Sequence, residues 1–117
     1  MPSIRDLVAV IRQREGVEAA IVLGRDGLLI DSQAVAGLDA DDIAARIPPI
    51  IGPADELGAV LGRGELQAAV LEHRGGLALV SVLSSEAVLF VLVSTRANVG
   101  QLLAELRRNR DQIAAIV

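Results

Sequence analysis

Three apolar runs joined by very short turns are the feature that most constrains the fold of this chain. They cover residues 66–72, 77–83 and 88–93, with the dipeptides Gly75-Gly76 and Ser84-Ser85 between them. Because such short turns leave successive strands side by side, the pattern predicts a three-stranded antiparallel meander. The last run is apolar at every position, which is typical of a central strand covered by helices on both faces.

The N-terminal segment predicts an amphipathic helix. Apolar residues recur at helical spacing over residues 4–11. Ser3 is the expected N-cap, with Asp6 three residues later to complete a capping box. Gly16 follows soon after, so we expect this helix to end near Arg14.

A β-hairpin is expected next. Residues 17–24 alternate apolar side chains with others, and a second apolar run covers residues 28–30. Asp26 and Gly27 lie between the two runs, and both residue types tolerate the positive φ of a tight hairpin turn. The sequence therefore predicts two further antiparallel strands.

Two more helices complete the prediction. The acidic residues Asp39, Asp41 and Asp42 precede an apolar pattern, which indicates a helix start and favours capping over a cation site. The prolines that follow predict a kink or break between Ile47 and Ala54. They are Pro48, Pro49 and Pro53. Residues 98–117 carry an apolar stripe behind a capping Asn98 and predict a final helix that covers the sheet.

We therefore expect one α+β domain over residues 1–117. Its element order is α-β-β-α-β-β-β-α, and its sheet lies between helices. A chain of 117 residues has room for one sizeable core and not for two.

Composition excludes several classes of function. The chain has no Cys, and all eleven of its basic residues are Arg, so thiolate chemistry and a P-loop lysine are both excluded. A single aromatic residue, Phe90, and a net charge of −4 argue against a nucleic-acid partner. No apolar run is long enough to span a membrane, and the charged N-terminus does not read as a secretory signal. We expect a cytoplasmic protein without a cofactor or a metal ion.

The motifs in this order resemble the Roadblock/dynein light chain family, Roadblock/LC7, across nearly the whole chain. The residues that carry the resemblance are 16–23 running into Asp26-Gly27-Leu28, the passage 57–66 with Gly62-Arg63-Gly64, and 98–107 opening the last helix. The resemblance implies a five-stranded antiparallel sheet with the first and last helices on one face and the second helix on the other. The three prolines depart from the family pattern, in which the second helix is usually continuous.

The resemblance also implies a function. Family members typically form dimers through the second helix and the following edge strand, here residues 66–72. Bacterial members similar to this chain, of the MglB type, act on small Ras-like GTPases as activators or scaffolds without donating a catalytic residue. We therefore expect a non-catalytic homodimer that binds and regulates such a GTPase. Its turn arginines Arg25, Arg63 and Arg74 are then solvated residues and not arginine fingers, and His73 is a solvated residue at a strand end.

The apolar excess around the second helix locates the expected contact surface. Residues 43–61 hold more apolar side chains than one helix face can bury, which indicates an interface but does not name the partner. The residues expected at the dimer or partner interface are Asp41, Asp42, Ile43, Arg46, Ile47, Ile50, Leu57, Val60, Leu66, Ala68 and Val70. The mean hydropathy of +0.51, high for a small chain, favours burial against a second copy.

Two other functions stay open at this point. The chain could be a structural subunit of a larger scaffold with no effect on GTP turnover. It could also be a small-ligand sensor with a cavity beside the sheet, which would require convergent polar groups.

Overall fold

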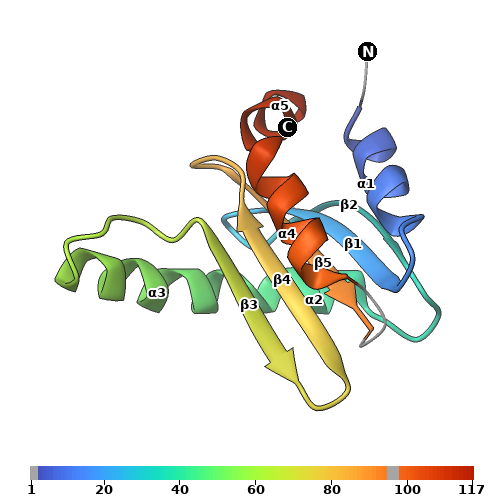
Figure 1. Ribbon diagram of the computed structural model, residues 1–117, viewed down its shortest axis with the longest axis horizontal. Coiled ribbons are helices and arrows are strands. Elements are labelled where there is room, and N and C mark those ends of the chain that lie inside the picture. The colour runs from blue at the N-terminus through green and yellow to red at the C-terminus, as the bar shows by residue number, and fades with distance from the viewer. Residues whose placement is uncertain (1–2, 95–97) are drawn as a thin grey trace.

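The computed structural model describes residues 3–94 and 98–117 and shows one five-stranded antiparallel sheet with helices on both faces (Figure 1). The elements, in chain order, are α1 (Ile4–Arg12), β1 (Val17–Gly24), β2 (Leu29–Ala34), α2 (Ala40–Arg46), α3 (Pro48–Val60), β3 (Ala68–His73), β4 (Gly76–Val82), β5 (Ala87–Val93), α4 (Val99–Arg108) and α5 (Arg110–Ile116). The strand order is β2-β1-β5-β4-β3. The α+β class and the predicted element order are confirmed, with the second and last helices each divided in two.

The apolar run at residues 88–93 forms the centre of the sheet, as predicted. In β5, every residue except Leu92 is buried, because β1 and β4 flank the strand and helices cover both of its faces. Strands β2 and β3 form the two edges. Among the described residues, the free backbone groups of the sheet therefore lie at these two edges, and β3 is the edge next to α3.

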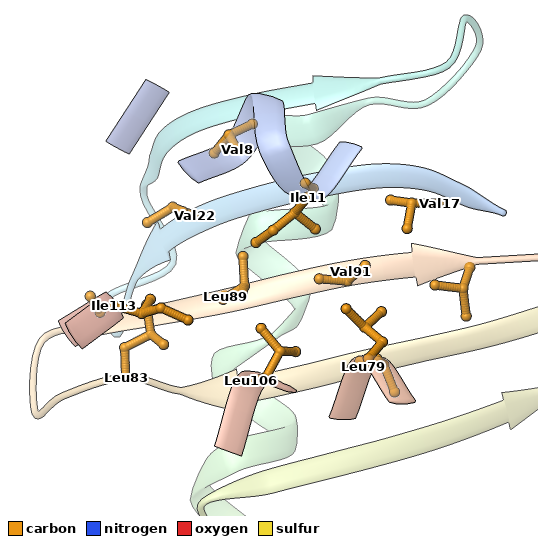
Figure 2. Close-up of a cluster of buried hydrophobic side chains, with 14 residues drawn as sticks. Val8, Ile11, Val17, Val22, Leu79, Leu83, Leu89, Val91, Leu106 and Ile113 are labelled. Carbon is orange, nitrogen blue, oxygen red and sulfur yellow. The ribbon is translucent and has the colours of Figure 1, made fainter. Parts of the chain in front are cut away.

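Two separate cores form on the two faces of the sheet. One lies under α1, α4 and α5, where Val8, Ile11, Leu106 and Ile113 point toward strand residues such as Val22 (Figure 2). The other lies under α2 and α3 and includes Ala44, Ile47, Ile51 and Phe90. This arrangement confirms that the first and last helices share one face and the second helix takes the other.

The predicted caps are present. Ser3 accepts a hydrogen bond from the Asp6 N–H, and the Asp6 carboxylate accepts one from the Ser3 N–H, which completes the capping box of α1. Asp39 caps α2 by accepting from the Asp42 N–H at 3.1 Å, and Asn98 caps α4 by accepting from the Gln101 N–H at 3.0 Å.

The second helix breaks at Ile47, at the start of the range from Ile47 to Ala54 in which a kink or break was predicted. A new helix starts at once, because Pro48 and Pro49 occupy its first two positions, where a missing N–H costs nothing. Pro53 then lies inside α3. Both Pro49 and Pro53 are exposed, so water can bind the Pro49 carbonyl that Pro53 leaves without a donor.

The prediction of a single final helix over residues 98–117 is wrong in one respect. The helix α4 ends at Arg108 and a second helix, α5, starts at Arg110, with Asn109 between them. The Asn109 side chain donates a hydrogen bond to the Glu105 carbonyl at 2.9 Å, and the backbone at Asn109 leaves the helical region, with φ −103° and ψ 11°. Asn side chains compete with helical hydrogen bonds in this way. The break turns α5 so that Ile113 reaches the core.

The predicted boundaries of the other elements shift by one to four residues. The first helix ends at Arg12 rather than near Arg14, and β2 starts at Leu29 and runs to Ala34. Strand β3 starts at Ala68 instead of residue 66 and ends at His73, whose side chain is exposed. No helix in the described part of the chain is long and apolar enough to cross a membrane.

Candidate interaction surface

Three exposed apolar side chains lie at the C-terminal end of α3 and immediately after it, near a sheet edge. Leu57 and Leu61 are each 58% exposed, and Val60 is 84% exposed. Figure 1 shows the C-terminal half of α3 running past the edge strand β3, beyond the rest of the molecule. We call Leu57, Val60 and Leu61 the α3 patch. A patch of this kind beside a free strand edge is typical of a protein interface.

The other end of α3 anchors the helix to the sheet. Ile47, in the break between α2 and α3, is 3% exposed, and Ile51 is 2% exposed. Ile43 and Ile50 are half-buried and pack against the same core. Ile47 was expected at the interface, but in the single chain it is a core residue. Its side chain packs beneath the exposed residues of α2 and α3.

Strand β3 carries its expected contact residues, Ala68 and Val70, on one face of the sheet, the face covered by α1, α4 and α5. Val70 is paired with Leu79, which lies in the core under α1, α4 and α5, and Ala68 is paired with Ser81 on that face as well. Cross-strand partners share a face of the sheet. Ala68 and Val70 therefore do not join the α3 patch through their side chains. The part of β3 that lies beside α3 and is open to a partner is the free backbone edge of the strand.

Helix α2 adds charged residues to the exposed surface. Asp41, Asp42 and Arg46 are exposed, and Arg46 Nε lies 3.1 Å from Asp42 Oδ1. The two side chains keep 76% and 55% of their surface exposed, and an i,i+4 pair of this kind stabilises a helix by only about 0.3 to 0.5 kcal/mol. Both charges remain available to a partner at little cost.

Asp55 fixes the position of α3, and sequence reasoning missed it. Its Oδ2 lies 3.0 Å from Arg25 Nη2 in the β1–β2 turn, and its Oδ1 accepts a hydrogen bond from the Leu66 N–H at 2.6 Å. The carboxylate thus joins α3 to the hairpin and to the segment that enters β3. Arg25, expected to be solvated, is instead held in this ion pair. Nothing in the spacing of residues 25, 55 and 66 marks them as neighbours.

The pKa of Asp55 reflects these contacts. The hydrogen bond from the Leu66 N–H lowers the pKa of the carboxyl most, desolvation partly opposes it, and Arg25 lowers it further. A carboxyl whose pKa is lowered by folding stabilises the protein above its unfolded pKa, and the stabilisation disappears as pH falls through the folded pKa.

We expect Asp55→Asn to remove this pH dependence. At neutral pH the variant should melt at a lower temperature than the wild type, because it loses the ion pair with Arg25. The difference should shrink as the pH falls below the ordinary carboxyl value of 3.8, where the wild-type carboxyl also becomes protonated. Thermal unfolding followed by circular dichroism at several pH values measures this difference in melting temperature. A melting difference that stays constant from neutral to acidic pH would contradict this role for Asp55.

A close backbone approach locks the end of α3 to the following loop. A Cβ atom added at Gly58 would lie 1.9 Å from the Gly64 carbonyl oxygen, and the Arg63 N–H donates to the Gly58 carbonyl at 2.9 Å. Gly64 has φ +86°, a conformation that side chains rarely adopt. The passage 58–64 is therefore a compact turn that returns the chain from α3 to the edge strand.

We expect Gly58→Ala to destabilise the protein by about 2 to 3 kcal/mol, because the new methyl group must displace the backbone at Gly64. The matched control is Gly100→Ala in α4, where the nearest atom to an added Cβ is 3.8 Å away. That change should be neutral or stabilise by up to about 1 kcal/mol. Chemical denaturation monitored by circular dichroism measures the free energy of unfolding of both variants. Equal effects of the two substitutions would contradict the close approach of Gly58 to the Gly64 carbonyl.

Comparisons with known proteins agree with this geometry. The model of the Roadblock/LC7 domain family matches residues 4–93. Two uncharacterized proteins of Methanocaldococcus jannaschii are 31% and 30% identical to the chain over 106 residues, which is 91% of this chain and 92% of each relative.

Solved structures show the same fold. The chain is similar to Myxococcus xanthus MglB, with a TM-score of 0.84 at 17% identity over 98% of this chain and 97% of that one. A Roadblock/LC7 domain from Streptomyces avermitilis gives a TM-score of 0.83 at 24% identity over 96% and 95%. Another similar structure is described as MglB with tetrameric arrangement, with a TM-score of 0.84 at 16% identity over 96% and 85%. The chain belongs to the Roadblock/LC7 domain family.

Proposed function

We propose that this protein is a homodimeric, non-catalytic module that binds and regulates a small Ras-like GTPase in the cytoplasm. The observation that carries the proposal is the α3 patch beside the free edge of β3, because a surface so apolar is costly to leave in water. Membership of the Roadblock/LC7 family and the fold shared with MglB support the choice of partner.

In the proposed dimer, the two copies of β3 pair and the two α3 patches pack against each other. Edge strands pair readily, because their outer N–H and C=O groups lack strand partners. A twofold interface brings each residue of the patch near its counterpart in the second copy. Of the expected interface residues, Leu57 and Val60 provide the apolar contact, and β3 from Ala68 through Val70 provides the backbone edge. Leu66 is fixed by Asp55 immediately before that edge.

The GTPase is proposed to bind over α2 and the start of α3. Asp41, Asp42 and Arg46 offer exposed charges there, and the half-buried Ile43 and Ile50 lie between them and the core. Charged groups at an interface act chiefly on the association rate and on partner choice. The alternative function is that of a scaffold subunit without effect on GTP turnover. A turnover measurement distinguishes this scaffold from a regulator.

GTP turnover with a Ras-like GTPase from the same source tests the proposal. We expect wild-type protein to bind the GTPase and to change its turnover rate. Asp41→Arg should weaken this binding by about tenfold by reversing one interface charge. The control Glu15→Arg makes the same charge change at an exposed residue between α1 and β1 and should have little effect. Binding without any change in turnover would favour the scaffold, and no binding would contradict the proposed partner.

A further inference from the structure

A polar groove lies apart from the α3 patch, between the segment that enters β3, the β4–β5 turn and the start of α5. It has a volume of about 620 Å³ and is lined in part by Arg63, Glu65, Gln67, Ser84 and Arg110. A second hollow of about 480 Å³ shares Gln67 and Arg110 and adds Arg107 from α4. Both hollows are open to solvent, and polar side chains contribute much of their lining.

The groove is basic in a chain that is acidic overall. Three arginines line the two hollows against one acidic residue, Glu65, while the whole chain carries a net charge of −4. Two of these arginines, Arg107 and Arg110, lie beyond residues 4–93, to which the family model is matched. Arg107 in α4 and Arg110 in α5 thus bring positive charge to the place where the C-terminal helices meet the sheet.

One guanidinium in the groove has a donor without an acceptor. Arg110 binds Gln67 twice, through Nη1 to the side-chain oxygen Oε1 and through Nη2 to the main-chain oxygen at 3.3 Å. Its Nε is buried and has no hydrogen-bond partner in the described part of the chain. An unsatisfied buried donor costs about 1 to 3 kcal/mol, and Arg110 would offer its Nε–H to an acceptor in the groove by giving up a hydrogen bond to Gln67.

Ser84 presents a second free donor to the same groove. Its hydroxyl oxygen accepts hydrogen bonds from the N–H groups of Glu86 and Ala87, both at 3.1 Å. A serine hydroxyl has two acceptor lone pairs and one proton to donate. With both lone pairs occupied, Ser84 can act toward a ligand only as a donor.

We propose that this groove binds the phosphate group of a small anionic ligand. Arginine side chains match the geometry of a phosphate group with parallel hydrogen bonds, so Arg63 and Arg110 can hold it in the groove without a lysine, and Arg107 adds positive charge from the adjoining hollow. The hydroxyl of Ser84 and the Nε–H of Arg110 supply donors for which residues 3–94 and 98–117 show no acceptor. Glu65 at the groove repels the ligand and limits its affinity.

Titration with inorganic phosphate, followed by ¹H–¹⁵N correlation NMR at constant ionic strength set with chloride, tests the site directly. We expect saturable shifts of the Ser84 amide and of the Arg110 Nε–H resonance. A parallel titration with glycerol phosphate distinguishes a free phosphate ion from a phosphate ester. The probe with the lower dissociation constant identifies the form that the groove prefers. No saturable shift at these groups with either probe would overturn the proposal.

Matched variants separate a built site from general attraction to basic residues. Arg110→Gln and, independently, Arg107→Gln should each weaken phosphate binding by about tenfold or more. Arg108→Gln removes the same charge from an exposed residue of α4 that lines neither hollow, and it should change the affinity by less than about twofold. Glu65→Gln should tighten binding. Equal weakening by Arg107→Gln and Arg108→Gln would overturn the proposal, whatever the oligomeric state of the protein.

Discussion

Leu106→Asp is expected to unfold the protein. Leu106 is 5% exposed and lies in the core that joins α4 to the sheet (Figure 2). Losing the leucine removes roughly 2 to 3 kcal/mol of burial free energy, and an unpaired carboxylate in that core costs several kcal/mol more. A domain of this size has a total stability of about 5 to 15 kcal/mol. Far-ultraviolet circular dichroism should show loss of the folded spectrum.

The control for this change is Ala104→Asp, on the same helix. Ala104 is exposed, so its carboxylate stays in water and the effect on the free energy of unfolding should be within about 0.5 kcal/mol. A folded Leu106→Asp variant with near wild-type stability would show that α4 is not an integral cover of the sheet.

The fold was largely predictable, because the strands are separated by clear turn signals and one of them is apolar throughout. What the sequence could not locate were the exact helix breaks. The prolines indicated a kink or break between Ile47 and Ala54, but they did not identify the residue, because two prolines are also compatible with the first positions of a new helix. At Asn109 the backbone leaves the helical region and the side chain binds the Glu105 carbonyl, and a helical pattern does not reveal either.

The interaction surface was predictable only in part. An apolar excess in residues 43–61 located the region, and Leu57 and Val60 are exposed as an interface requires. The same excess could not separate exposed residues from the buried Ile47, because both satisfy a helical pattern. Asp55 was missed for another reason, since its partners come from segments distant in the sequence and meet it only through the fold.

Val60→Arg is expected to dissociate the proposed dimer. Val60 is 84% exposed in the single chain, so the substitution leaves the core intact, and a cation at the C-terminal end of α3 suits the helix dipole. In a twofold interface, the two introduced arginines would lie near each other in place of apolar contacts. Loss of a central apolar contact together with charge repulsion should weaken association by about 2 to 4 kcal/mol, roughly 30- to 1000-fold.

The control for the dimer is Leu28→Arg. Leu28 is also an exposed apolar residue, at 68%, but it lies in the β1–β2 turn, at the end of the edge strand opposite β3. The two variants therefore carry the same change in charge and similar loss of exposed apolar surface. Only Val60→Arg alters the α3 patch.

The mass of the protein in solution, measured by light scattering with refractive-index detection, tests the central claim most directly. Refractive index is the suitable detector, because the chain has no Trp or Tyr. We predict twice the chain mass of 12.2 kDa, or a higher multiple, for the wild type and Leu28→Arg. Val60→Arg should shift toward a single chain mass. A wild-type protein that stays at 12.2 kDa at high concentration would contradict the dimer on which the proposed regulation depends.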